Sequence, residues 1–243
     1  MNAENLTGVL ALVGLLILTF LFIWLLGKEG KSNVLEEEEK RSNRIHSMAR
    51  DAFIIGLIVL MTFVPNIGFI NIGPFSLTLL HLPVLLGAGL FGWKKGALYG
   101  LVFGLMSWIK ALTGATNVFD LAFQKIYVAV PPRLLFGLIA GILFSASAKI
   151  GHIRKRMYAM MGIAFLATCL HTVMVFLLLF VSEEWVAPWL FSSDPAIKGT
   201  TITVLGFLGI GMGLEALLGA LLTPTLVGSV RRAVPSLRKQ KQS

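Results

Sequence analysis

The sequence alternates long apolar stretches with short polar or charged segments. The first stretch, residues 6–26, contains no ionisable side chain. As a helix rising about 1.5 Å per residue, it would reach about 31 Å and cross the hydrocarbon core of a bilayer. The remaining apolar segments, which we also predict to be spans, are 52–70, 77–92, 96–112, 130–148, 158–181 and 201–228. The pattern predicts an all-α, polytopic membrane protein with a six-helix bundle and one extra N-terminal transmembrane helix.

The first apolar stretch could instead be a signal peptide. A signal peptide begins with basic residues and ends in small residues at its cleavage site. Here the start carries Glu4 and no Lys or Arg, and Trp24 is followed by two leucines where small residues should stand. We therefore interpret residues 1–27 as a retained transmembrane helix.

The rest of the chain divides by polarity. Residues 28–50 form a charged segment in which Glu36–Glu39 precede Lys40 and Arg41, so that opposite charges recur four residues apart, as in a solvated helix. We interpret this segment as a cytoplasmic linker. It leads to a membrane bundle over 51–228, and a basic cytoplasmic tail follows over 229–243.

The composition excludes several classes of protein. The chain has 243 residues, of which 56% are hydrophobic and 14% charged. A soluble domain has about 25% charged residues, so a soluble enzyme, a disordered protein and a secreted disulfide scaffold are all excluded. Cys169 is the single cysteine, which rules out an intramolecular disulfide.

The basic residues behind the net charge of +9 are distributed in a way that predicts the orientation of the chain in the membrane. Of the 21 Lys and Arg residues, 17 fall in four segments: 27–51, 93–95, 149–157 and 229–243. Cytoplasmic loops are enriched in Lys and Arg, so this distribution predicts an N-terminus outside the cell and a C-terminus in the cytoplasm. It also argues against nucleic acid as a partner.

Catalytic motifs are missing. The sequence has no H-E-x-x-H, no G-x-S-x-G and no histidine pair at metal-ligand spacing, and Gly30-Lys31-Ser32 lacks the earlier glycine of a Walker A loop. We predict that the protein is not an enzyme and uses no cofactor or metal. If it drives transport, the energy comes from a partner or an ion gradient.

Small residues recur at four-residue spacing and indicate close helix contacts. Gly92, Gly96, Gly100 and Gly104 form one such row. These rows serve either packing within the chain or docking of a membrane-embedded partner. The candidates for partner docking are Ala52, Gly56, Gly96, Gly100 and Gly104.

Polar residues in or near the outer half of the membrane are candidates for binding a small polar molecule. Glu215 falls near mid-membrane, and Arg133 follows two prolines at a predicted helix start, where a guanidinium could grip a carboxylate. Each has a structural alternative: a hydrogen bond to another span for Glu215, and contact with lipid headgroups for Arg133. The apolar loop 66–76 could fold back over the bundle as a lid. The candidate substrate-binding residues are Asn71, His81, Asn117, Arg133, His171 and Glu215; the two histidines could equally be satisfied buried side chains.

Two signatures resemble a known family. Thr78–Ala88, Phe91–Ala97 and Gly100–Ser107 together resemble one signature of the S components of energy-coupling factor (ECF) vitamin transporters, in the pantothenate-type and riboflavin-type branch. Pro132–Gly141 resembles the second. The resemblance covers about 50–228. It implies a six-helix bundle with an outward-facing vitamin pocket, a transmembrane coupling subunit and two cytoplasmic ATPases as partners, and toppling of the S component in the membrane to release substrate inside.

The sequence departs from the family pattern in three places. Family members dock through small residues on the first bundle helix, typically Ala-x-x-x-Ala, whereas this chain has Ala52 and Gly56 at that spacing. Most members lack the N-terminal helix, and Trp93 stands where the turn usually has proline. The family pocket supports the six substrate-binding candidates as approximate positions.

Two functions follow from these observations. The first is a non-enzymatic binding subunit for a water-soluble vitamin, with pantothenate favoured because Arg133 could meet its carboxylate; riboflavin, folate-like, cobalamin or queuosine-like ligands stay open. The second is an autonomous ion-coupled carrier that uses Glu215.

Overall fold

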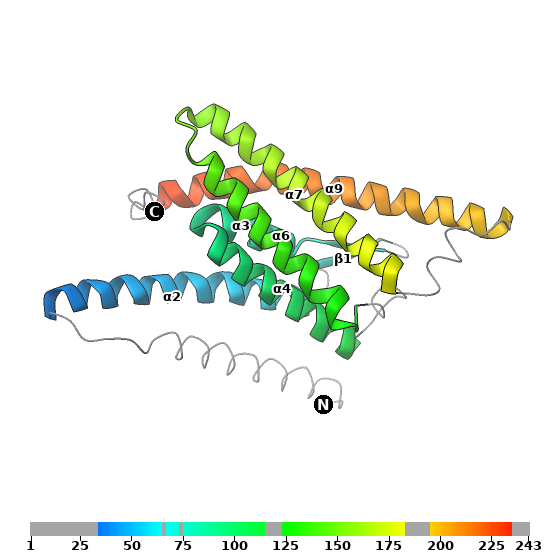
Figure 1. Cartoon of the computed structure of the whole chain (residues 1–243), viewed down its shortest axis with the longest axis horizontal. Helices are drawn as coiled ribbons and strands as arrows, with labels where there is room; N and C mark the ends of the chain where they lie inside the picture. Colours follow the sequence, from blue (N-terminus) through cyan, green and yellow to red (C-terminus); the bar gives the residue numbers. More distant parts are fainter. Residues whose placement is uncertain (1–33, 65–66, 73–74, 115–122, 183–194, 235–243) are drawn as a thin grey trace. The chain divides into compact units, whose positions relative to one another are not determined.

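The described part of the chain is helical apart from one short hairpin. The computed structural model describes residues 34–64, 67–72, 75–114, 123–182 and 195–234. The elements in chain order are α2 (Val34–Phe63), β1 (Phe69–Ile72), β2 (Phe75–Thr78), α3 (His81–Phe91), α4 (Trp93–Gly114), α6 (Ile126–Ser147), α7 (Ile153–Ser182) and α9 (Pro195–Ala233) (Figure 1). The chain forms two compact units, Met1–Phe53 and Ile54–Ser243.

The helices confirm the predicted class of an all-α, polytopic membrane protein. Among the described residues, 5 helices are long and apolar enough to cross a membrane, and α3 is a shorter apolar helix. Each of the six spans predicted after residue 50 overlaps one helix. The predicted N-terminal span at 6–26 lies outside the described residues.

The helix boundaries differ from the predicted ones. The described part of the charged segment, from Val34, and the first bundle span form one continuous helix, α2. Helix α6 begins at Ile126 instead of residue 130, so Pro131 and Pro132 lie inside the helix and not at its start. Helix α9 is also longer than its predicted span and covers 39 residues.

The segment predicted as a lid contains a β-hairpin. Strands β1 and β2 are antiparallel, with Phe69 opposite Thr78 and Asn71 opposite Ser76. The hairpin is closed at its base by the Leu79 N–H, which donates to the Gly68 carbonyl at 2.8 Å. Strand β2 contacts α9, so the segment folds back onto the helices of its own unit.

Helices α4 and α6 pack with their backbones in direct contact. A Cβ atom at Gly96 or Gly100 would overlap the α6 carbonyl oxygen of Gly137 or Arg133, and one at Gly104 would lie 2.8 Å from the Val130 Cα. In lipid, where apolar burial drives helix association weakly, such close approach supplies van der Waals contact. Gly96, Gly100 and Gly104, three of the residues expected to dock a partner, are buried against α6 within this chain.

The other helices of this unit complete the core around α3. Helix α3 packs on α4, α6 and α9, while α7 packs on α6 and α9 (Figure 1). Large side chains such as Tyr99, Phe103 and Phe136 are buried between them. Phe165, Leu166 and Leu177 on α7 are exposed, as suits a helix face turned toward lipid.

Candidate functional site

Three elements meet at Glu215. The Thr78 N–H, at the end of β2, donates to Glu215 Oε1 on α9. His81, in the first turn of α3, places Nδ1 at 2.7 Å from the Thr78 carbonyl oxygen and Nε2 at 3.1 Å from the Glu215 carbonyl oxygen. These contacts join the hairpin, α3 and α9. Thr78 contributes its backbone, and Glu215 contributes both its side chain and its backbone. We call this set the hairpin junction.

The two ring nitrogens of His81 cannot both donate a hydrogen bond when the ring is neutral. Both neighbours are carbonyl oxygens, which only accept hydrogen bonds, and a neutral imidazole carries one N–H. The shorter contact, from Nδ1 to Thr78, fits the donor. His81 is 2% exposed, so the junction is closed to solvent at this point.

Gly219 allows α9 to approach this junction closely. Gly219 lies one turn after Glu215, and a Cβ placed on it would sit 3.3 Å from Leu85 Cδ1, 3.3 Å from Thr168 Oγ1 and 3.5 Å from His81 Nε2. The three neighbours come from α3 and α7. Sequence reasoning missed this role, although a glycine four residues after Glu215 on the same helix face was the available signal.

Arg133 folds back along its own helix because of the prolines beside it. Pro132 has no N–H, so the Val128 carbonyl loses the helical donor it would otherwise have. Arg133 Nη1 instead donates to the carbonyl oxygens of Val128 and Ala129, both at 3.0 Å. The expectation that the side chain projects from a rigid helix start is therefore corrected. The side chain is buried and held by the first turns of α6.

The rest of the Arg133 guanidinium lies among aromatic rings. Its central carbon is 4.4 Å from the ring centroid of Phe123 and 5.6 Å from that of Phe103. Its Nε is buried and has no hydrogen-bond partner among the described residues. A buried donor left without an acceptor costs about 1–3 kcal/mol, and more when it is charged, so an acceptor supplied by a ligand would be favourable here.

His171 also lies next to Phe103. Its ring centroid is 6.0 Å from Phe103 and 5.1 Å from Phe136. Its Nε2 is buried, again with no partner within the described residues. Two buried nitrogen atoms near Phe103, Arg133 Nε and His171 Nε2, thus have no hydrogen-bond partner among the described residues.

Four of the predicted substrate-binding residues come together. Arg133 interacts electrostatically with Glu215 and with His171, and His171 also interacts with His81. The set contributes a buried cation, a carboxylate and two imidazoles, enclosed by phenylalanine rings. We call these four residues the buried polar cluster: His81, Arg133, His171 and Glu215.

Such a cluster suits recognition of a small polar molecule. Ligand sites typically combine apolar walls with a few convergent polar groups that fix orientation. Within the described ranges no group of three or more His, Cys, Asp or Glu residues could hold a metal ion. The available chemistry is a guanidinium donor, a carboxyl group and two imidazoles.

The remaining two predicted substrate-binding residues are Asn71 and Asn117. Asn71 lies in β1 opposite Ser76 in the hairpin register. Asn117 lies outside the described residues. The phenylalanines at 103, 123 and 136 were missed by sequence reasoning because apolar side chains in a membrane helix carry no distinctive signal.

The two other docking candidates differ from the α4 glycines. Ala52 and Gly56 lie one turn apart on α2 and both are exposed. A Cβ placed on Gly56 would have no heavy atom within 4 Å. This stretch of α2 is therefore physically open to another helix.

Comparison with known proteins adds independent information. The family model described as "ECF transporter, substrate-specific component" matches residues 46–229. The chain is 28% identical over 200 residues to the pantothenic acid transporter PanT of Lactococcus lactis subsp. cremoris strain MG1363, covering 74% of this chain and 91% of that protein. It is 28% identical over 141 residues to the pantothenate transporter PanT of Leuconostoc mesenteroides subsp. mesenteroides, covering 56% of this chain and 69% of the relative.

Proposed function

The chain belongs to the family of substrate-specific components of ECF transporters, and from this premise we propose that it captures pantothenate outside the cell. The observation that carries the choice of ligand is the buried Arg133 Nε, which has no acceptor among the described residues. The names of the two relatives support the same ligand class. An ATP-driven partner module would supply the energy for delivery to the cytoplasm.

The cluster offers a complementary group for each end of pantothenate, which has a carboxylate at one end and hydroxyls at the other. Since Nη1 of Arg133 is already used by helix carbonyls, the carboxylate would approach the Nε side of the guanidinium. His171 Nε2 would meet a hydroxyl, with Phe103 and Phe136 against the apolar middle of the ligand. Glu215 would accept a hydrogen bond from a hydroxyl or amide.

The hairpin would close the outer side of the site. It is held at Thr78 by the Glu215 carboxylate and by His81. A ligand that also contacts Glu215 would couple its binding to the position of the hairpin. Asn71, His81 and Asn117 complete the proposed set of ligand contacts.

The proposed partners are a transmembrane coupling subunit and two cytoplasmic ATPases. The two exposed small residues Ala52 and Gly56 of α2 form the proposed docking surface for the coupling subunit. The proposed organisation has an N-terminal transmembrane helix at 1–27, a cytoplasmic linker at 28–50, the bundle at 51–228 and a cytoplasmic tail at 229–243. The distribution of basic residues supports a proposed orientation with the N-terminus outside.

Calorimetry with the purified protein tests this proposal. Arg133→Ala should weaken pantothenate binding at least about 30-fold, because truncating one partner of a buried charged pair costs about 2–5 kcal/mol. Arg154→Ala removes the same charge from an exposed position of α7 and should leave affinity unchanged.

Because Arg133 also satisfies α6 carbonyls, the melting temperature of each variant must accompany its affinity. Unaltered affinity in a folded Arg133→Ala variant would remove Arg133 from the site. Pantothenate uptake into vesicles that hold this chain alone, without ATP but with a proton gradient, would instead favour a carrier that uses Glu215.

A further inference from the structure

A second meeting point of helices lies at Gly89, at the far end of α3 from His81. A Cβ placed on Gly89 would lie 2.9 Å from Val227 Cγ2 on α9, 3.6 Å from Met160 Cε on α7 and 3.7 Å from a Phe144 ring carbon on α6. Four helices therefore converge on this glycine, and the residues one turn further along α7 and α9 are brought together.

Those residues are two arginines. Arg156 lies one turn before Met160 in α7, and Arg231 lies one turn after Val227 in α9. Arg231 Nη2 donates to the Gly89 carbonyl oxygen at 2.8 Å, which fixes its guanidinium at the end of α3. The two guanidinium groups lie close enough to repel each other. An anion between them would turn this repulsion into attraction.

The local sequence adds positive charge and no carboxylate. Neither α7 nor the part of α9 after Glu215 contains an Asp or Glu. Arg154 and Lys155 precede Arg156 and are exposed, and Arg232 follows Arg231. These two segments therefore offer an external anion several positive charges and no acidic side chain.

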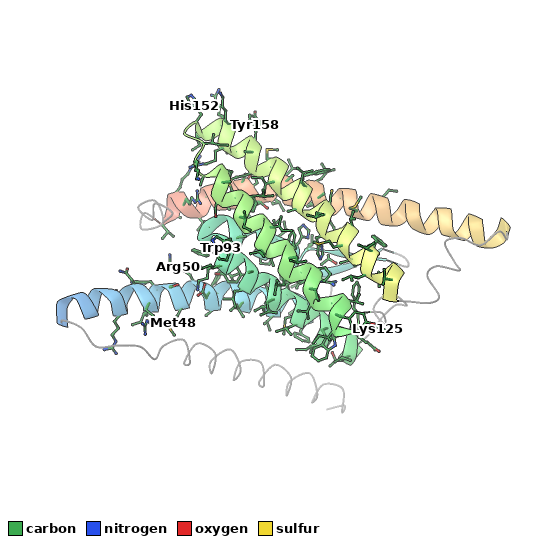
Figure 2. All side chains as sticks on the ribbon, in the orientation of Figure 1. Met48, Arg50, Trp93, Lys125, His152 and Tyr158 are labelled. Atoms are coloured by element: carbon green, nitrogen blue, oxygen red, sulfur yellow. The ribbon has the colours of Figure 1, made fainter. Side chains whose placement is uncertain are left out.

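Apolar side chains adjoin the arginines on the outside. Ile153 is 58% exposed and Met157 is 40% exposed; they lie one turn apart on α7, on either side of Arg156. Tyr158, 70% exposed, also lies near the beginning of α7 (Figure 2). An acyl chain attached to a phosphate held by the arginines would run toward the membrane interior, against exposed apolar side chains of α7 such as Met157 and Phe165. A free phosphate would use only half of this surface.

We propose that Arg156 and Arg231 bind the phosphate headgroup of an anionic phospholipid, with its acyl chains lying along the exposed apolar side of α7. The inference does not depend on the identity of the transported ligand. It requires only that α7 and α9 span the membrane, which their length and composition allow. Under the proposed topology, the lipid belongs to the cytoplasmic leaflet.

Native mass spectrometry of the full chain tests the proposal. The protein is reconstituted in vesicles of equal parts phosphatidylcholine and phosphatidylglycerol, extracted, and its retained lipids are identified. The wild type should retain phosphatidylglycerol in preference. Arg156→Gln should lower that preference about fivefold, the effect of about one surface cation near an anionic membrane, and should leave the Gly89 contact intact.

Matched controls separate a specific site from general charge. Arg154→Gln removes the same charge two residues away, from an exposed position, and should retain the lipid as the wild type does. Equal retention by Arg156→Gln and the wild type would overturn the proposal, as would equal losses in Arg156→Gln and Arg154→Gln. If Arg156→Gln leaves lipid retention unchanged but reduces co-purification with the coupling subunit, the surface is a protein contact and the lipid proposal is wrong.

Discussion

Two contacts in this chain are held together in different ways, one by close backbone packing and the other by hydrogen bonds. Between α4 and α6, glycines bring the backbones together, and any added Cβ at Gly96 or Gly100 would overlap the neighbouring helix. At the hairpin junction, α3, α9 and β2 meet through hydrogen bonds of Thr78, His81 and Glu215. Backbone packing of the first kind leaves no room for sliding or separation. A few hydrogen bonds can exchange for those of a ligand, so the junction is where movement is expected.

The largest effect should come from breaking the glycine contact. Gly100→Leu forces a side chain into the α6 backbone at Arg133, where nothing flexible can yield. We expect a loss of stability of about 3 kcal/mol or more and little monodisperse protein. Gly162→Leu on α7, where a Cβ would have no heavy atom within 4 Å, is the control and should purify normally. Size-exclusion chromatography compares the two, and equal yields would show that α4 and α6 are not packed this tightly.

Breaking the hairpin junction should change ligand binding more than folding. Glu215→Ala removes the acceptor of the Thr78 N–H, a hydrogen bond to a charged group worth about 1.5–3 kcal/mol. Pantothenate should then dissociate about tenfold faster or more in stopped-flow measurements, while the protein still purifies. Glu215→Gln keeps an oxygen acceptor for Thr78 and should recover part of the loss. If the two variants dissociate at the same rate, the backbone contact does not hold the hairpin.

A smaller change probes the closeness of α9 to the junction. Gly219→Ala adds a methyl group 3.3 Å from Leu85 and Thr168, a tight but not overlapping position. We expect a loss of about 1 kcal/mol, measured as a lower thermal unfolding midpoint in detergent. Gly162→Ala should keep or slightly raise the midpoint, because alanine favours a helix over glycine where space is open. A Gly219→Ala midpoint as high as that of the control would contradict the close packing of α9.

The smallest effect on the isolated protein should come from Gly56. Because a Cβ there meets open space, Gly56→Leu should leave both the unfolding midpoint and pantothenate affinity unchanged. It should reduce the amount of coupling subunit that co-purifies, since the proposed docking face would lose its close approach. Unchanged complex yield would remove Gly56 from the docking surface.

The sequence predicted the helices well because long apolar runs leave a chain in lipid few alternatives to a helix. It could not say which helix the glycine row on α4 faces: spacing signals close approach, but not its partner. Arg133 shows a further limit of prediction from the sequence. The prolines that redirect its side chain were visible, but their effect depends on α6 beginning at Ile126, before them.

The sequence nominated residues for the candidate site, and their role in binding stays a prediction. His81, Arg133, His171 and Glu215 were chosen because ionisable groups in a membrane span are costly unless they have a function or a partner. Sequence reasoning did not predict that Thr78 would contribute through its backbone, because an N–H carries no side-chain signature. The hairpin itself was missed because apolar and polar residues in 66–76 also fit an irregular loop.

The most direct test of the central claim compares two ligands on the unaltered protein. Pantothenol differs from pantothenate only in carrying a hydroxymethyl group where pantothenate has its carboxylate. If the buried Arg133 guanidinium receives that carboxylate, calorimetry should show pantothenate binding at least about 30-fold more tightly than pantothenol. Equal affinities for the two would contradict the account.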